Sequence, residues 1–391
     1  MSNLFKKRVY GVQIIKSKNS NYNADFTGSP RTLPDGTVYA TDKVSKFNDR
    51  KHIGRNDESV IFTKTTYKQD LKPMVLKEVY ESHFGPISKH NKVEALKNLL
   101  SKIDVRLFGA TFALKGADNM NLSIHGPVQV SYGINRFESL LDSGMFTDQI
   151  SSPYASKEGA DQTTLGSQTR SQEAHYVHHF SINPKNISSY IKQIYNITIS
   201  ELLDCKKVKK ENELDLDKVT LLHSFFKFDQ KFEKENLEVF KKFINDKIDE
   251  IKKAFYKNFH LLSNTDIQQL KEAMALATTY YDSTSKKDSE NELLMWIELK
   301  EDSEKILKNF TELISISTEK GKTKIDFSKV KTYLDKHNDA ISKIEFYYED
   351  DFTDIIGFDK FNNTEDENWE IKHFKDLNQV TGEENKEKQD S

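Results

Sequence analysis

A short alternating stretch in the first half of the chain, HGPVQVSYGI, places the strongest constraint on the fold. Apolar and polar side chains alternate there: Val128, Val130 and Tyr132 are separated by Gln129 and Ser131. A period of two predicts a β-strand that buries one face and leaves the other face polar. The fold must therefore contain a sheet that is covered on one side.

The two ends of this strand are unusual. It opens on Gly126 and Pro127, and it runs into Asn135 and Arg136. Gly126 has no Cβ and Pro127 has no amide hydrogen, so another backbone segment could approach closely at this point. An ordinary turn would explain the same two residues.

The rest of the chain mixes strand and helix patterns. Strands are predicted at residues 8–16, 104–114, 176–182, 292–299 and 343–348. Helices are predicted at 92–103, 232–258, 264–281 and 327–337, and the third of these has Asn264 or Thr265 as its cap. Residues 51–90 look irregular, and residues 148–175 are a Ser/Thr/Gln-rich excursion. This order predicts an α+β fold, with a four-stranded antiparallel sheet and helices on one face.

Composition narrows the class of protein. The chain has 25 Phe and 16 Tyr, which supply area for a core although 30% of residues are charged. There is no run of about 18 apolar residues and no apolar segment of a secretory signal near the start. The single cysteine, Cys205, excludes a disulfide framework and a cysteine-rich zinc site. We therefore expect a soluble, cytoplasmic protein.

Charge is distributed unevenly along the chain. Residues 1–200 carry 26 Lys and Arg against 18 Asp and Glu, whereas the remainder carries 32 against 43. The first half is therefore net positive and the second net negative, although the total is only −3. A basic half suggests a polyanionic partner, and chance patterning in a lysine-rich chain is the alternative.

Several enzyme classes lack support in the sequence. There is no GxxxxGK[ST] loop, no GxGxxG loop and no GxSxG elbow. His175, His178 and His179 form an HxxHH string, but neighbouring residues of a strand face opposite ways and do not easily share a metal. Loop residues Asp25, Asp35 and Asp42 could serve a nuclease, although loop aspartates are more often turn formers.

The remaining signal is a mixture of polar, cationic and aromatic residues in the first loops. Lys, Arg and Asn stand there between the rings of Tyr22, Phe26, Tyr39, Phe47, Phe62 and Tyr67. Single-stranded nucleic acid needs this mixture, since cations neutralise phosphates and flat rings stack on bases.

Five short sequence segments, taken together and in order, indicate a particular protein family. They are NYNAD (21–25), TDKVSKFNDR (41–50), DVRLFGATFA (104–113), HGPVQVSYGINR (125–136) and YVHHFSINP (176–184). Together they resemble the backbone subunit of the CRISPR Cascade complex, in the RAMP superfamily, with the type I-B branch as the closest match. The resemblance is strong over 8–50 and 100–186, fair over 264–300, and poor over 51–90 and 204–262.

The resemblance implies a modified RNA-recognition-motif (ferredoxin-like) palm, built on an antiparallel sheet, with finger and thumb insertions. The implied divisions are residues 1–50 (first palm strand and RNA-binding loop), 51–100 (finger-like insertion), 101–147 (palm core), 148–175 (thumb hairpin), 176–203 (palm), 204–262 (helical insert), 263–360 (second half of the palm) and 361–391 (acidic, disordered tail).

The resemblance also implies a function. Many copies would bind one CRISPR RNA as a helical filament and support its pairing with target DNA in antiviral defence. Such a subunit does not cut and needs no cofactor. Its partners would be the CRISPR RNA, the target strand, further copies of itself, and the handle-binding, large and small Cascade subunits. The helicase-nuclease would be an indirect partner, and no membrane is involved.

Site residues follow from the same resemblance. Asn21, Asn23 and Asp25 match the family's Asn-Pro-Asn-Gly-Asp loop without its Pro and Gly. Lys46 and Arg50 match basic positions that face phosphates, and Gln129 and Arg136 would meet ribose and phosphate. The remaining predicted RNA-binding residues are Arg31, Arg106, Arg170 in the thumb, and Ser283, Ser285 and Lys286 before a late strand.

Two other functions stay open. Related backbone subunits of type III complexes cut target RNA with a loop aspartate, for which Asp25 or Asp42 would be the candidate here. A general single-stranded RNA-binding protein outside CRISPR biology would show the same loop chemistry without forming a filament.

Overall fold

A computed structural model describes residues 4–55, 59–62, 67–114, 120–138, 144–151, 165–186, 191, 262–281, 286–358, 369–374 and 376–377. The chain divides into two compact units. The first comprises Met1–Lys6, Met74–Pro127 and Pro184–Ile267, and the second comprises Lys7–Pro73, Val128–Asn183 and Gln268–Ser391. The predicted helix at 232–258 lies outside the described residues. Among the helices that are described, none has the length and apolar character needed to cross a membrane.

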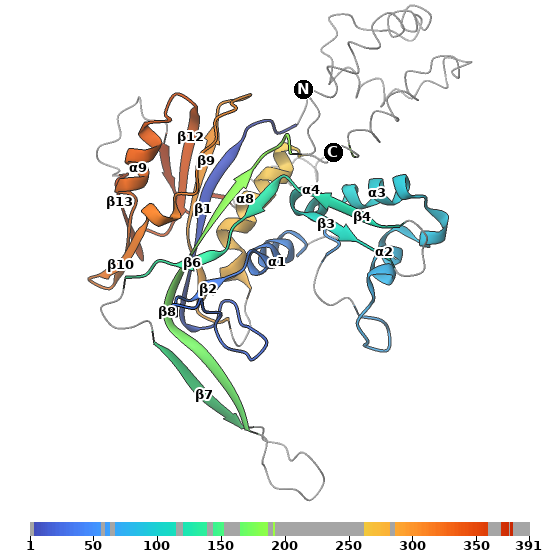
Figure 1. The fold of residues 1–391 in the computed structure, drawn as a ribbon, viewed down its shortest axis with the longest axis horizontal. Coiled ribbons are helices and arrows are strands. Elements are labelled where there is room, and N and C mark those ends of the chain that lie inside the picture. The colour runs from blue at the N-terminus through green and yellow to red at the C-terminus, as the bar shows by residue number, and fades with distance from the viewer. Residues whose placement is uncertain are drawn as a thin grey trace, which may run out of the picture. The chain divides into compact units, whose positions relative to one another are not determined.

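The described part of the second unit is built on a nine-stranded sheet (Figure 1). Its strand order is β14-β12-β9-β1-β8-β6-β2, and β5 and β7 also pair with β8. The bounds are β1 Val9–Ser20, β2 Tyr39–Ala40, β5 Val128–Val130, β6 Gly133–Asn135, β7 Met145–Ser151, β8 Leu165–Ile182, β9 Ser289–Leu299, β12 Ile341–Tyr348 and β14 Trp369–Lys372. The mixed α+β class is as expected. The sheet is larger than the four strands predicted, and the β12–β14 pairing is parallel rather than antiparallel.

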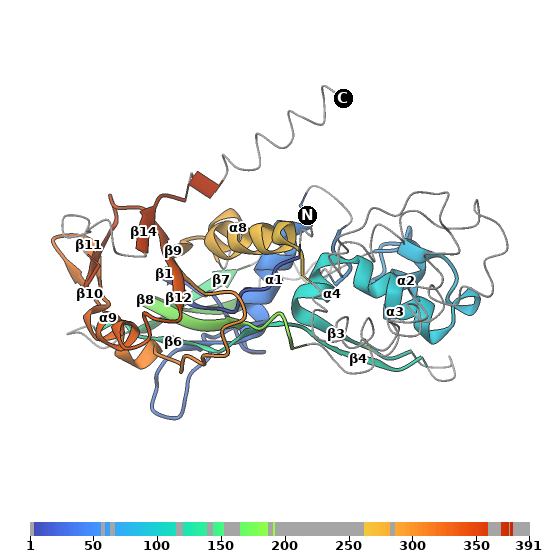
Figure 2. The ribbon, with the colours of Figure 1, turned by 90° about the horizontal axis from the view of Figure 1, so that it is seen from above.

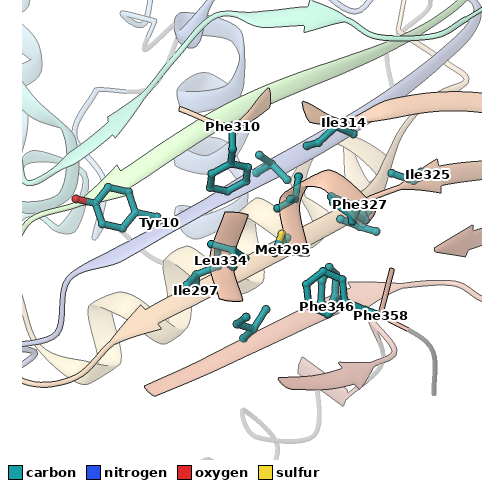
Figure 3. Close-up of a cluster of buried hydrophobic side chains, with 14 of the residues drawn as sticks. Tyr10, Met295, Ile297, Phe310, Ile314, Ile325, Phe327, Leu334, Phe346 and Phe358 are labelled. Carbon is teal, nitrogen blue, oxygen red and sulfur yellow. The ribbon is translucent and has the colours of Figure 1, made fainter. Parts of the chain in front are cut away.

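β1 lies between β8 and β9, and both of its faces are covered. Tyr10, Val12 and Ile14 enter a core with residues of α9 (Ser328–Asp335) and of a smaller sheet. Figure 3 shows part of this core. The smaller sheet consists of β10 (Ser315–Glu319), β11 (Lys322–Asp326) and β13 (Thr353–Ile356). Ile15 enters a second cluster on another part of the unit. Burial on both faces explains why the sequence of β1 reads as a nearly continuous apolar run.

Two helices pack together along the sheet of the second unit, α1 (Asp42–Ile53) and α8 (Asn264–Tyr280) (Figure 2). The Asn48 amide donates to the Thr278 hydroxyl at 3.1 Å. The Gln13 amide of β1 donates to the carbonyl oxygen of Met274 at 2.7 Å and accepts from the Ser45 hydroxyl at 2.9 Å. Since one side chain bonds both helices, these buried hydrogen bonds hold α1 and α8 on the same face of β1.

The first unit contains one segment whose secondary structure differs from the prediction. The stretch DVRLFGATFAL was predicted to be a strand, but α4 (Ile103–Phe108) precedes the short strand β3 (Gly109–Phe112). The guanidinium of Arg106 holds this helix by donating to the carbonyl oxygens of Leu100 and Ser101 and to both carboxylate oxygens of Asp266. These tertiary bonds outweigh the β preference of the local residues.

Other elements of the first unit are α2 (Leu76–Phe84), the short 3₁₀ helix Ile87–Lys89, α3 (Lys92–Ser101) and β4 (Leu122–His125). The prediction of α3 is confirmed, whereas α2 lies in a region that was expected to be irregular. The expected close approach at Gly126 is also confirmed. A Cβ on that residue would lie 2.3 Å from the carbonyl oxygen of Leu107.

Three further expectations are corrected. The predicted strand at 125–134 is interrupted, because β5 and β6 each pair with β8 and Tyr132 between them is 49% exposed. Helix α8 is capped by Ser263, whose hydroxyl accepts from the amide of Asp266, rather than by the two residues after it. Residues 361–391 were expected to be disordered, but Trp369–Lys372 form β14, and Trp369 is buried.

Candidate nucleic-acid interface

The loop after β1 uses its predicted binding residues to hold its own shape. The Asn21 amide donates to the carbonyl oxygens of Gly28 at 3.0 Å and Thr169 at 3.3 Å. The Asn23 side-chain oxygen accepts from the amide of Thr41 at 2.9 Å and from its hydroxyl at 3.1 Å. Thr41 is the N-cap of α1, so Asn23 joins the loop to the start of this helix.

Asp25 closes a tight turn within the same loop. One of its carboxylate oxygens accepts from the hydroxyl of Thr27 at 2.7 Å, from the amide of Thr27 at 2.8 Å and from the amide of Ser29 at 3.0 Å. These bonds, that from the Thr27 hydroxyl above all, lower the pKa of Asp25. The turn leaves the ring of Phe26 fully exposed. Arg31 follows the turn and contributes to the lower pKa of Asp25.

The two predicted basic residues of α1 lie beside acidic residues of their own helix. Lys46 pairs with Asp42 at 3.0 Å, and its side chain is only 13% exposed. Arg50 follows Asp49, whose carboxyl is buried. Burial raises the pKa of Asp49 to about 8, and the charges of Arg50 and Lys46 oppose this. The outward cations of α1 are Lys43 and Lys51.

Lys51 belongs to a cluster of rings and cations that we call the α1–α8 cluster, made of Phe47, Lys51, Tyr281 and Lys286. The Lys51 ammonium lies 3.6 Å from the centre of the Tyr281 ring, and Lys286 lies 5.5 Å from it. The rings of Phe47 and Tyr281 meet edge to face at 5.7 Å. Two like charges are therefore held around one ring, which favours an anion between them.

Asn291 of β9 fixes the end of α8 from which Tyr281 follows. Its side-chain oxygen accepts from the amides of Thr278 at 2.8 Å and Thr279 at 3.0 Å, and its amide donates to the carbonyl oxygen of Met274 at 2.8 Å. A buried side chain thus replaces hydrogen bonds within the last turn of the helix. This arrangement positions the ring that holds Lys51.

The β7–β8 hairpin extends beyond the rest of its sheet (Figure 1). Its described arms contain residues 148–151 and 165–175 of the predicted thumb, and residues 152–164 lie outside the described residues. Arg170 lies on this hairpin. Its guanidinium donates to the carbonyl oxygen of Asn19 at 3.2 Å and to the side-chain oxygen of Gln168 at 3.0 Å, and Asp148 lies 3.9 Å away. Arg170 therefore ties the hairpin to the end of β1.

An open cavity of about 280 Å³ lies against the end of β1. Two lysines, two carboxylates and an asparagine line it, and these are Lys16, Lys18, Asn19, Asp288 and Glu290. The charges balance, so this cavity presents no net positive charge to a polyanion.

The other predicted residues are distributed over both units. Gln129 is exposed on β5, and the Arg136 guanidinium lies 3.7 Å from Glu312. Arg106 belongs to the first unit, where it is bound to Asp266. Ser283 and Ser285 lie outside the described residues. Their role, like that of every residue predicted to bind RNA, stays a prediction.

Two stacked rings that the sequence did not connect lie at one end of the sheet. Tyr39 of β2 and Tyr132, between β5 and β6, have ring centres 5.6 Å apart and planes only 15° from parallel. Tyr132 is 49% exposed. The sequence placed Tyr39 among the aromatic residues of the polar loops and Tyr132 on the apolar face of a strand, so nothing in it connected the two rings.

The histidines of β8 face different surroundings, as predicted for neighbours on a strand. The His178 ring contacts Tyr22 edge to face, whereas the His179 ring contacts Tyr10 and Phe310. Burial lowers the pKa of both rings to about 4. Within the described residues no group of three His, Cys, Asp or Glu side chains is arranged to hold a metal ion.

Comparisons with known proteins bear on these features. A family model described as "CRISPR-associated protein Cas7" matches residues 7–244. Two solved structures are similar to the chain. One is titled "CRISPR RNA-guided surveillance complex", with 12% identity, a TM-score of 0.39, and coverage of 89% of this chain and 91% of that one. The other is titled "CRISPR RNA-guided surveillance complex, pre-nicking", with 10% identity, a TM-score of 0.38, and coverage of 97% and 99%. The search of curated proteins finds no match.

Proposed function

The chain belongs to the CRISPR-associated Cas7 family, and from this premise we propose that it is a CRISPR RNA-binding backbone subunit of a type I-B Cascade complex. Several copies would line one guide as a helical filament and support its pairing with target DNA in antiviral defence. The proposal includes an RNA-recognition-motif-like palm, the other Cascade subunits as partners, and a cytoplasmic location.

The observation that carries the proposal is the α1–α8 cluster. A guide-binding subunit meets a different spacer sequence in each complex, so it must hold phosphate, ribose and ring faces rather than base edges. The cluster offers ammonium groups beside aromatic rings, which is the chemistry that suits single strands of any sequence. The few cations of one copy bind RNA weakly. When several copies bind one RNA strand, the high effective concentration of each copy near the strand strengthens the binding of all of them.

Removing the two lysines tests this proposal. We expect Lys51→Gln with Lys286→Gln to weaken RNA binding and to flatten the dependence of log K on log salt by about 0.7 per lost phosphate contact, or about 1.4 in all. Affinity for a labelled single-stranded RNA would be measured in the full chain at several salt concentrations.

A matched control removes two exposed lysines, one on α9 and one at its C-cap, through Lys329→Gln with Lys336→Gln. It changes the net charge equally but leaves the cluster intact, so its salt slope should equal that of the unmodified protein. Equal slopes for both double variants would contradict the role of the cluster.

We also propose that the subunit does not cut RNA. Asp25 is occupied by hydrogen bonds inside its turn, and Asp42 pairs with Lys46. Both candidates for a cutting aspartate therefore have structural partners. Incubating the assembled complex with complementary labelled RNA and Mg²⁺ should leave the RNA intact. Evenly spaced products that disappear in Asp25→Asn or Asp42→Asn would instead establish a type III-like endonuclease.

A further inference from the structure

The stacked pair of Tyr39 and Tyr132 presents an aromatic face that nothing in the described chain covers fully. The two planes are nearly parallel, and about half of the Tyr132 surface is open to solvent. A ring that is already stacked on one side can extend the stack on its exposed side by one further flat ring.

The backbone around Tyr132 is held firmly on β8. The amide of Ser131 donates to the carbonyl oxygen of His179 at 2.7 Å, and the amide of His179 donates to the Ser131 hydroxyl at 3.0 Å. The His178 ring donates to the carbonyl oxygen of Ser131 at 2.9 Å. Gly133 packs so closely on that ring that an added Cβ would lie 2.4 Å from its Nε2.

The second ring is fixed as well. Tyr39 and Ala40 pair with Ile134 and Gly133, so β2 is held on β6. An ordered aromatic pair loses little conformational entropy when a ligand stacks on it, which is the advantage of a preorganised site.

We propose that the exposed face of Tyr132 receives one nucleobase of a bound single-stranded RNA. This inference rests on the proposed function, and it adds base stacking to the phosphate contacts of the α1–α8 cluster. An aromatic face accepts any of the four bases, because every base has a π-face, so the contact does not restrict the guide sequence. The same RNA strand contacts the lysines of the α1–α8 cluster through its phosphates.

The position of the pair along the chain is consistent with this. Tyr39 lies three residues before the first residue of α1, and Lys51 lies near the other end of the same helix. At 1.5 Å per residue, Asp42 and Lys51 are about 14 Å apart along the axis. A strand of a few nucleotides can span that length, with a base at one end and a phosphate at the other.

The simpler explanation is that the two tyrosines only stabilise the pairing of β2 with β6. The experiment therefore separates ring stacking from stability and from charge. Tyr132→Ala, Tyr132→Phe and the unmodified full chain would be titrated with two labelled RNAs of equal length, an oligouridylate and the same backbone with abasic positions. Phe352→Ala is the control, because Phe352 is 70% exposed on the turn before β13.

We expect Tyr132→Ala to weaken binding of the oligouridylate about tenfold and to leave binding of the abasic RNA unchanged. Tyr132→Phe and Phe352→Ala should bind both RNAs as the unmodified protein does. An equal affinity of Tyr132→Ala for the oligouridylate, or an equal loss on both RNAs, would overturn the inference while leaving the proposed function standing. Failure of the unmodified protein to bind either RNA would overturn both.

Discussion

Single residues decide which cations of α1 face outward. Asp42 and Lys46 are four positions apart and form an ion pair, which withdraws Lys46 from solvent. Lys51 instead lies over the ring of Tyr281. The first of these contacts can be read from local spacing, whereas the second joins residues that are distant in the chain. The sequence could therefore mark Lys46 and Arg50 as basic positions of this segment without showing which lysine would reach a partner.

A buried ion pair at the centre of the sheet gives a prediction about pH. His175 lies between Glu292, at 2.5 Å, and Glu173, at 3.3 Å. Burial opposes the charged form of His175, but the charge of Glu292 and the hydrogen bonds to Glu173 and Glu292 together outweigh it and raise the pKa of the ring. Burial likewise opposes the charge of Glu292, but the charge and hydrogen bond of His175, together with a hydrogen bond from Thr323 and the charge of Lys16, outweigh it and lower the pKa of that carboxyl.

The sign of the effect follows from these two directions. The contribution of His175 to stability is complete below its ordinary pKa of 6.5 and is lost as pH rises through the raised value. The contribution of Glu292 is present above its ordinary 4.5 and is lost as pH falls through the lowered value. We expect Glu292→Gln to reduce the free energy of unfolding by about 3 kcal/mol near pH 5.5, because it removes the nearer of the two carboxylates that pair with the buried charge of His175.

Urea denaturation at about pH 5.5 and about pH 9 would check this, and the cost of Glu292→Gln should be smaller at the higher pH, where a smaller fraction of His175 is protonated. Glu290→Gln is the control, because Glu290 is exposed on the same strand. A cost for Glu292→Gln that is the same at both values of pH would contradict the assignment of a charged pair.

Whole elements were predicted well where the apolar period was regular. The strands around β1, β9 and β12 and the helices α3, α8 and α9 all lie where the sequence placed them. Each carries its own burial pattern, which tertiary contacts then reinforce. Strand β8 was also predicted, but only over its last residues, because its earlier part lies in the polar hairpin.

The elements that were missed depend on contacts outside their own sequence. Helix α4 is held by the bonds of Arg106 to distant groups, and β14 lies in a segment whose average composition is acidic. Of the α1–α8 cluster, the sequence indicated only Lys286 as a binding residue, because Phe47 and Tyr281 come together only through the packing of α1 on α8. Composition and periodicity carry no information on such long-range pairs.

The strand β14 yields a prediction at the scale of an element. Trp369 is buried in the core beside Phe358, and its strand pairs with β12. We expect Trp369→Ala to lower the free energy of unfolding by about 3–5 kcal/mol, which is the usual cost of deleting a large buried ring. Glu370→Ala on the same strand should cost less than about 1 kcal/mol, since that side chain is half exposed.

Urea denaturation of both variants would measure these costs. If Trp369→Ala unfolded at the same urea concentration as the unmodified protein, residues 369–372 would not be part of the packed sheet.

At the scale of the whole molecule, the second unit carries most of the residues proposed to bind RNA. The first half of the sequence is net positive and the second net negative, and opposite charges on one chain suit the proposed head-to-tail contact between copies. Contacts of this heterologous kind propagate as a helix rather than closing as a pair.

The central claim is that several copies of this chain share one RNA strand. The most direct test is the mass of the particle purified from cells, measured together with its nucleic-acid content before and after ribonuclease treatment. The account predicts a particle that contains several protein copies and one RNA, and that loses its size when the RNA is digested. A single protein chain free of nucleic acid would contradict it.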